Sequence, residues 1–285
     1  MKEIKFEDIK KYSDLTERIL NASDNDIKYK TKKEIIREFD IEKWSQILED
    51  ISNDKSIGLK EIDEKMESFS TISPFFYKDS FYLASGKEVF KKHLEVFRET
   101  ISPYIQNASA IVELGAGYGS KILNLSKFPE YREMPLIAAE YTENGCESII
   151  KLSQRINKKI DVGFCDLKQQ EIEGVDIPEN SIIFTSYALH YVQKLPLSFI
   201  NFMLNLNPKI IINFEPCYEL HSKNTHGLIC KRYIELNDYN IDMISTLKQS
   251  EKDGHIALEI EKNIIGGNPM LPISIIKWAS NRTSS

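Results

Sequence analysis

The residues best suited to chemistry in this chain are three glycines at alternate positions, Gly115, Gly117 and Gly119. They follow an apolar run, 111–114, with the length and branching typical of a buried strand, and they precede a run with helical spacing of its apolar positions. Glycines in such a turn let the backbone bend sharply and approach a ligand, while the free amides of the new helix face that ligand. The pattern predicts a strand, a tight turn and a helix that together hold a nucleotide-like cofactor.

The position of the third glycine distinguishes two cofactors. A dinucleotide-binding turn, G-x-G-x-x-G, requires glycine at position 120, which is Ser120. An acidic residue, Glu113, also stands two places before the first glycine, where a carboxylate suits a cationic amino-acid head better than a pyrophosphate. Both features favour S-adenosylmethionine, and an NAD-dependent oxidoreductase is kept as an alternative.

Two further acidic residues end apolar runs. Glu140 closes the run 136–139, and Asp166 closes the run 160–165 and is followed by Leu167. Because the carboxyl ends of neighbouring parallel strands meet at one edge of a sheet, these acids are expected beside the glycine turn. Glu140 can bind two ribose hydroxyls, and Asp166 can accept from an adenine amino group while Leu167 packs on the ring.

The segment Glu113-Leu-Gly-Ala-Gly-Tyr-Gly119 resembles the first motif of the class I S-adenosylmethionine-dependent methyltransferases, over about residues 85–285. The resemblance implies an α/β fold: a seven-stranded, mostly parallel Rossmann-like sheet with helices on both faces and an antiparallel C-terminal hairpin. The run 181–186 lacks an Asn-Pro-Pro-Tyr type signature, which weakens the case for an adenine-base or glutamine methylase. The predicted cofactor-binding residues are Glu113, Gly115, Ala116, Gly117, Tyr118, Gly119, Glu140, Tyr141, Asp166, Leu167 and Ser186.

Composition limits the partners. Of the 285 residues, 41% are hydrophobic, which predicts a globular core. The formal net charge of −6 argues against nonspecific binding to nucleic acid. The charged N-terminus predicts no signal peptide or membrane span and therefore a cytoplasmic location. The expected partner is a small-molecule or peptide acceptor, with a homodimer left open. No metal is expected, because no suitable ligand spacing occurs among Cys146, Cys165, Cys217 and Cys230.

The segment before the glycine turn is expected to form a separate unit. Residues 1–73 contain no proline and one glycine, and their apolar positions recur at helical intervals, which predicts a helical appendage over residues 1–84 before a cofactor-binding domain over 85–285. The resemblance to the methyltransferase family implies that this appendage is a lid over the methyl donor. Five aromatic residues lie within 73–82. The resemblance implies that tyrosines of such a lid, here Tyr77 and Tyr82, either close the pocket or orient an acceptor, whereas a hydrophobic hinge is the simpler explanation for the phenylalanines.

Three residues near the ends of the fourth and fifth strands are candidates for catalysis. His190 and Tyr187 follow the run 181–186, and Glu215 follows the run 209–214. A neutral imidazole at His190 can take a proton from the acceptor, or it can serve only as a packing residue. Glu215 binds or deprotonates the acceptor, or is a turn acid held by the following proline.

The acceptor site is expected in an insertion at about 215–250, because the family commonly builds it after the fifth strand. The residues predicted to bind the acceptor are Tyr77, Tyr82, His221, His226, Arg232 and Tyr233. Alternation in 255–278 around Gly266 and Gly267 predicts the closing hairpin.

The predicted reaction is direct displacement, in which an oxygen or nitrogen of a small molecule attacks a sulfonium methyl group. The acceptors considered are a sugar, a natural-product intermediate and a peptide intermediate. Such a reaction needs mainly a dry pocket that holds both reactants, and a base only when the acceptor is protonated at neutral pH. A non-catalytic protein that binds the same cofactor is the second alternative.

Overall fold

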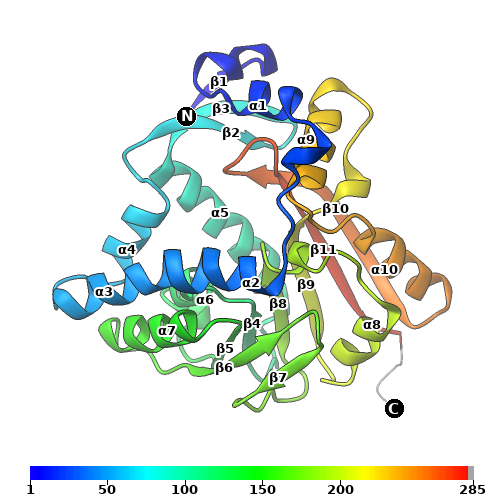
Figure 1. Ribbon diagram of the computed structural model, residues 1–285. Coiled ribbons are helices and arrows are strands. Elements are labelled where there is room, and N and C mark those ends of the chain that lie inside the picture. The colour runs from blue at the N-terminus through cyan, green and yellow to red at the C-terminus, as the bar shows by residue number, and fades with distance from the viewer. Residues whose placement is uncertain (282–285) are drawn as a thin grey trace.

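The computed structural model describes residues 1–281, and a mixed sheet runs through its centre (Figure 1). The strands are β1 (Lys2–Ile4), β2 (Ile72–Tyr77), β3 (Ser80–Ser85), β4 (Ile111–Leu114), β5 (Leu136–Glu140), β6 (Asp161–Asp166), β7 (Glu171–Glu173), β8 (Ile182–Ser186), β9 (Ile210–Pro216), β10 (Ile256–Gly266) and β11 (Ile273–Ser280). Within the described residues they pair in the order β1-β3-β2-β10-β11-β9-β8-β4-β5-β6-β7.

The seven strands β6-β5-β4-β8-β9-β11-β10 form the predicted Rossmann-like sheet. The strands β4, β5, β6, β8 and β9 run parallel, while β10 and β11 make the antiparallel hairpin at the C-terminal end. The predicted α/β class, parallel core and closing hairpin are confirmed. The sheet is wider than predicted, because β7 extends one edge and the β2, β3 and β1 strands extend the other.

Helices cover both faces of this sheet. The α-helices are α1 (Leu15–Asn21), α2 (Lys32–Ile35), α3 (Ser45–Asn53), α4 (Leu59–Met66), α5 (Gly86–Ile101), α6 (Ser120–Leu125), α7 (Glu143–Arg155), α8 (Leu197–Leu204), α9 (Thr225–Leu236) and α10 (Met243–Lys252). A π-helix, η3 (Ile36–Trp44), joins α2 to α3, and short 3-10 turns include η6 (Leu189–Tyr191).

Alternation along the buried strands sorts their side chains into two cores. Ile111 and Ile182 pack in the cluster that includes residues of α5, α6 and α7, whereas Val112 and Ile183 pack with residues of α8 and α10. Strands buried on both faces have nearly continuous apolar runs, which is the pattern of 182–184 and, apart from Glu113, of 111–114.

The aromatic segment predicted as a hinge forms a hairpin instead, so the appendage is not entirely helical. The strands β2 and β3 pair with each other, and Tyr77 and Phe76 of β2 pair with Ile265 and Gly266 of β10. The turn is made by Lys78 and Asp79, both with positive φ (44° and 63°), which is the geometry of a two-residue hairpin turn. The sequence did not indicate this hairpin, because glycine or asparagine usually occupies the two turn positions that are Lys78 and Asp79 here.

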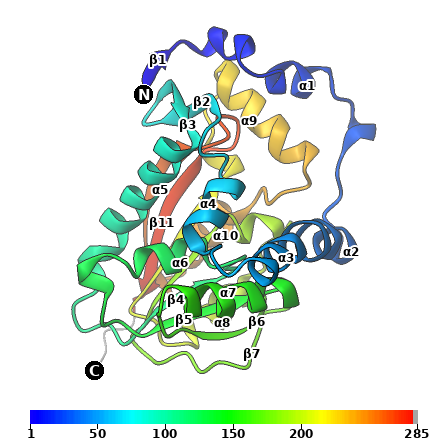
Figure 2. The same ribbon diagram turned by 90° about the vertical axis from the view of Figure 1, so that its left-hand side faces the viewer.

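The helical part of the N-terminal segment lies against the core. Figure 2 shows α2 and α3 alongside α7, and Asp40 of η3 accepts a hydrogen bond from the backbone amide of Asn144 at 2.9 Å. Asp63 of α4 is buried and accepts from Tyr118 Oη (3.0 Å), Ser120 Oγ (2.7 Å) and Asn124 Nδ2 (2.7 Å). One carboxylate of the appendage thus anchors the turn and helix that follow β4. No helix within residues 1–281 has the length and apolarity needed to cross a membrane.

Candidate active site

The glycine turn joins β4 to α6 in a conformation that glycine alone adopts readily. Gly115, Gly117 and Gly119 have φ values of 73°, 58° and 81°. At Gly115 an added Cβ would lie 2.4 Å from the Cβ of Ala188, and at Gly117 it would lie 3.1 Å from the Trp44 ring. The turn is therefore packed closely by the segment after β8 and by η3.

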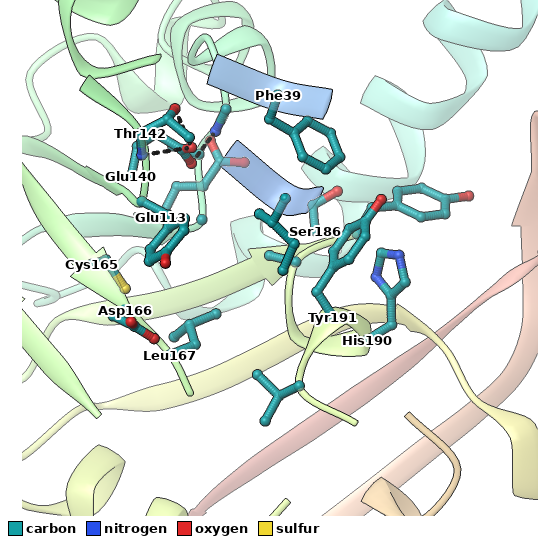
Figure 3. A pocket seen from close by; sticks show the side chains of 18 of the residues that line it. Phe39, Glu113, Glu140, Thr142, Cys165, Asp166, Leu167, Ser186, His190 and Tyr191 are labelled. Atoms are coloured by element: carbon teal, nitrogen blue, oxygen red, sulfur yellow. Dashed lines mark hydrogen bonds between the residues drawn. The ribbon is translucent and has the colours of Figure 1, made fainter. Parts of the chain in front are cut away.

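A cavity of about 530 Å³ opens at the carboxyl ends of the parallel strands (Figure 3). This volume is in the range of small-molecule sites. The predicted residues in its wall are Glu113, Gly115, Ala116, Gly117, Tyr118, Glu140, Tyr141, Asp166, Leu167, Ser186, Tyr187 and His190. Gly119 lies outside the wall and is the N-cap residue of α6 instead.

The carboxylates of Glu140 and Asp166 order the loops at the ends of β5 and β6. Glu140 accepts from the amide of Gly117 (2.8 Å) and from the hydroxyl of Thr142 (2.8 Å), as Figure 3 shows. Asp166 Oδ1 accepts from the amides of Lys168 (2.9 Å) and Gln169 (3.0 Å). No donor among residues 1–281 bonds to Asp166 Oδ2, which leaves that oxygen to accept from a ligand.

Glu113 is the most deeply buried acid of the cavity wall. Its side chain is 2% exposed and accepts a hydrogen bond from the amide of Ile122 at 3.0 Å. Burial raises the pKa of Glu113 to about 8, more than the amide of Ile122 and the ammonium of Lys121 lower it. Burial thus favours the protonated form of Glu113, and a cation bound beside it would favour the ionised form.

This raised pKa makes stability depend on pH. The folded-state pKa of Glu113 lies above the ordinary value of 4.5. Its contribution to the free energy of unfolding is therefore fully present below pH 4.5 and is lost as the pH rises through about 8. We expect the melting temperature of the wild type to fall relative to Glu113→Gln by on the order of 5 °C between pH 5 and pH 9. Calorimetric unfolding at a series of pH values measures this difference in melting temperature. Glu143→Gln, a substitution of an exposed acid, is the control. Parallel curves for the wild type and Glu113→Gln would contradict the assignment.

His190 lies on η6 at the opposite side of the cavity from the acids (Figure 3). Its Nδ1 is 3.1 Å from Glu215 Oε2, and the two side chains are 2% and 0% exposed. A carboxylate oxygen that accepts at Nδ1 selects the tautomer in which Nδ1–H donates and Nε2 carries the lone pair. The pair has the arrangement of a general base with an orienting carboxylate.

Glu215 itself does not reach the cavity, which corrects its predicted position at the crevice edge. It accepts from the amides of Ala188 (3.0 Å) and Leu189 (2.9 Å) and from the hydroxyl of Thr185 (2.8 Å). A carboxylate surrounded by these donors fixes the segment that carries His190. It can act on an acceptor only through that histidine.

Tyr187 lines the cavity with a positive φ of 50°. Its hydroxyl lies 3.4 Å from the carbonyl oxygen of Leu271, to which it donates, and burial raises the pKa of that hydroxyl well above its usual value. This side chain is suited to shaping the wall and poorly suited to accepting a proton.

The six residues predicted to bind the acceptor lie outside the cavity wall, which corrects their grouping with the site. Tyr77 and Tyr82 belong to the β2–β3 hairpin, and Arg232 pairs with Asp24 at 2.9 Å. The six residues are Tyr77, Tyr82, His221, His226, Arg232 and Tyr233.

His221, His226 and Tyr233 of this group are held by packing. His226 Nε2 lies 2.7 Å from the carbonyl oxygen of Pro269, and its ring stacks on Phe76 at 5.3 Å. His221 is buried, and Tyr233 packs among apolar residues of α9 and the N-terminal segment. From 215–250 only Tyr239 reaches the cavity wall that the structure describes.

Sequence reasoning predicted that the N-terminal segment forms a lid, but it missed which residues of that segment line the cavity. Lys30, Lys32, Ile35, Phe39 and Trp44 all line it. The helical apolar face containing Ile35 and Phe39 indicated that this segment packs against another part of the protein. Nothing in the local pattern identified which part. The cavity wall is therefore shared between the core and the segment before it.

No family model matches the chain, and no curated protein matches it by sequence. The magnesium protoporphyrin IX methyltransferase of Synechocystis PCC 6803, solved with bound SAH, is similar in structure over 87% of this chain and 100% of its own, with a TM-score of 0.50 and 11% identity. The fold is thus that of the class I methyltransferases.

Two other solved structures are more distant in shape. The small RNA methyltransferase HEN1 has a TM-score of 0.48 and 17% identity over 70% of this chain. The chain spans 26% of the length of that protein. The plantazolicin methyltransferase, solved with SAH and a triazolic analogue, has a TM-score of 0.45 and 14% identity over 68% of this chain and 86% of its own.

Proposed function

We propose that the protein is an S-adenosylmethionine-dependent methyltransferase acting on an oxygen or nitrogen of a small molecule or peptide intermediate. The observation that carries the proposal is the gathering of three strand-end acids, Glu113, Glu140 and Asp166, around one glycine turn in one cavity. The adjacent parallel strands β4, β5 and β6 bring them together from positions far apart in the sequence.

The residues of this wall fit the chemistry of such a donor. Glu140 would accept from ribose hydroxyls, Asp166 Oδ2 would accept from the adenine amino group, and Leu167 would pack on the ring. Glu113 would face the cationic amino-acid head. Gly115 and Gly117 line the cavity with backbone alone, which lets a ligand approach the turn closely.

His190 stands across the glycine turn from these acids, after β8. In an open α/β sheet, ligands bind where neighbouring connections leave toward opposite faces, and here that point lies between β4 and β8. When bound, the donor supplies a methyl group already activated by its sulfonium. The chain holds the acceptor, excludes water with the N-terminal segment, and accepts the acceptor's proton at His190 Nε2.

Calorimetric titration of the purified protein with S-adenosylhomocysteine and with NAD tests the cofactor. We expect saturable binding of S-adenosylhomocysteine and none of NAD. Failure to bind S-adenosylhomocysteine would overturn the proposal, and binding of NAD alone would favour the oxidoreductase alternative.

Turnover is tested separately, with methyl-labelled donor and a cell extract. We expect a labelled product whose mass identifies the acceptor. Binding without transfer to any component of the extract would instead favour a non-catalytic protein.

A further inference from the structure

We propose that the end of the cavity beside His190 binds an aromatic acceptor carrying both a hydroxyl and an anionic group. We call this region the aromatic end; its residues are Lys30, Phe39, Tyr187, His190, Tyr191 and Tyr239, all of which line the cavity. The inference rests on the proposed function, and it specifies the class of acceptor.

The aromatic end is lined by rings set at steep angles to one another. Phe39 and Tyr191 meet edge to face at 5.3 Å and 85°, and Tyr191 and Tyr239 do so at 5.2 Å and 77°. The His190 ring lies 4.4 Å from that of Tyr239 at 86°. Rings in contact at such angles present both faces and edges to the cavity that they line, and an aromatic guest beside them is stabilised by the same edge-to-face contacts.

The charge at the aromatic end is an ammonium. Lys30 is 8% exposed, and its Nζ lies 5.6 and 5.8 Å from the ring centres of Tyr191 and Tyr239. Its partner Glu38, 2.8 Å from Nζ, does not line the cavity and also binds Lys43 Nζ at 2.9 Å. Two ammonium groups therefore share one carboxylate.

Other charged groups near Lys30 do not turn this end into an anionic surface. Asp238 bonds to the backbone amide of Lys30 at 3.0 Å and is outside the wall. Glu67 lines the cavity but pairs with Lys121 at 3.3 Å. Glu113, Glu140 and Asp166 lie on the opposite side from His190 (Figure 3). An acceptor in this end therefore meets a cation, which favours a carboxylate and disfavours an amine.

The hydroxyl requirement comes from His190. When Nδ1–H donates to Glu215, Nε2 carries the lone pair of a ring that lines the cavity. In the transfer, the acceptor oxygen forms its bond to the methyl carbon as the carbon–sulfur bond breaks, and that electron pair goes to sulfur. The hydroxyl proton goes to Nε2, which becomes an imidazolium stabilised by Glu215.

The test compares three probes of similar size on protein saturated with S-adenosylhomocysteine: 4-hydroxybenzoate, 4-hydroxybenzamide and tyramine. We expect the anionic probe to bind about tenfold more tightly than the neutral one, and tyramine to bind most weakly. Lys30→Met should abolish the tenfold preference. Lys43→Met is the matched control, since Lys43 pairs with the same carboxylate but lies outside the cavity wall, and it should keep the preference. Calorimetry measures the affinities.

Equal affinity for the three probes, a preference for tyramine, or no binding of 4-hydroxybenzoate at millimolar concentration would overturn the inference. So would a preference that survives in Lys30→Met. Binding of S-adenosylhomocysteine is measured first in each variant, so loss of the aromatic end is distinguished from loss of the donor site. A wild type that binds no S-adenosylhomocysteine would instead remove the proposed function and this inference with it.

Discussion

Gly115→Ala is expected to weaken the binding of S-adenosylhomocysteine by about 10- to 100-fold. The new Cβ would lie 2.4 Å from the Cβ of Ala188, and neither methyl group can rotate away because each is attached directly to backbone. The backbone of Ala188 is in turn held by Glu215, at 3.0 Å from its amide. Either the glycine turn or the segment carrying His190 must move, and both border the cavity. Calorimetric titration measures the loss.

Gly254→Ala is the control for this substitution. Gly254 has a φ of 78°, close to the 73° of Gly115, but an added Cβ would have no neighbour within 4 Å. Both variants therefore bear the cost of a left-handed alanine, on the order of 1–2 kcal/mol, and only Gly115→Ala adds a collision in the site. If both variants bound the donor product as tightly as the wild type, the glycine turn would not be the donor site.

His190→Gln is expected to lower the rate of methyl transfer at neutral pH by about 10²- to 10⁴-fold, the range of a general base. Glutamine can still donate to Glu215, so the surrounding segment keeps its hydrogen bond, but it offers no basic nitrogen. Affinity for S-adenosylhomocysteine should change little, because the acids proposed to bind the donor, Glu113, Glu140 and Asp166, stand on β4, β5 and β6. Steady-state rates with the acceptor identified from the extract measure the effect.

The pH profile separates this role from a packing role. Without a base, transfer to a hydroxyl should recover as rising pH ionises the acceptor itself, so the rate ratio of wild type to His190→Gln should shrink. The exposed His255 provides the control substitution, His255→Gln, which should leave the rate unchanged. An unchanged rate in His190→Gln, or a loss that persists equally at every pH, would contradict the assignment.

Much of the parallel sheet was predictable because its signals are local. The runs expected at 111–114, 136–140 and 160–166 correspond to β4, β5 and β6 within a residue. Each is short, rich in branched apolar residues and ended by an acid or a glycine, and these properties depend on the strand's own burial. The hairpin of β2 and β3 was missed because its turn residues, Lys78 and Asp79, are unusual for a left-handed turn.

The residues of the proposed acceptor site were predicted less well, because their positions depend on packing and not on a local signal. Arg232 and His226 carry suitable chemistry, but the structure pairs one with Asp24 and packs the other beside Pro269. Lys30 and Tyr239, which do line the cavity, stand in stretches that show no motif. Side-chain type indicates what a residue can do, and only packing decides whether it faces a ligand.

The sequence by itself determined the strand, turn and helix around Gly115 and the acids at the ends of three strands. These features follow from backbone conformation and strand periodicity, which act over a few residues. The tertiary structure alone decided that Glu215 lies behind His190 and that Lys30 and Phe39 close the cavity. Those contacts join residues 25 to more than 150 positions apart, and no local pattern specifies the partner of a side chain across such a distance.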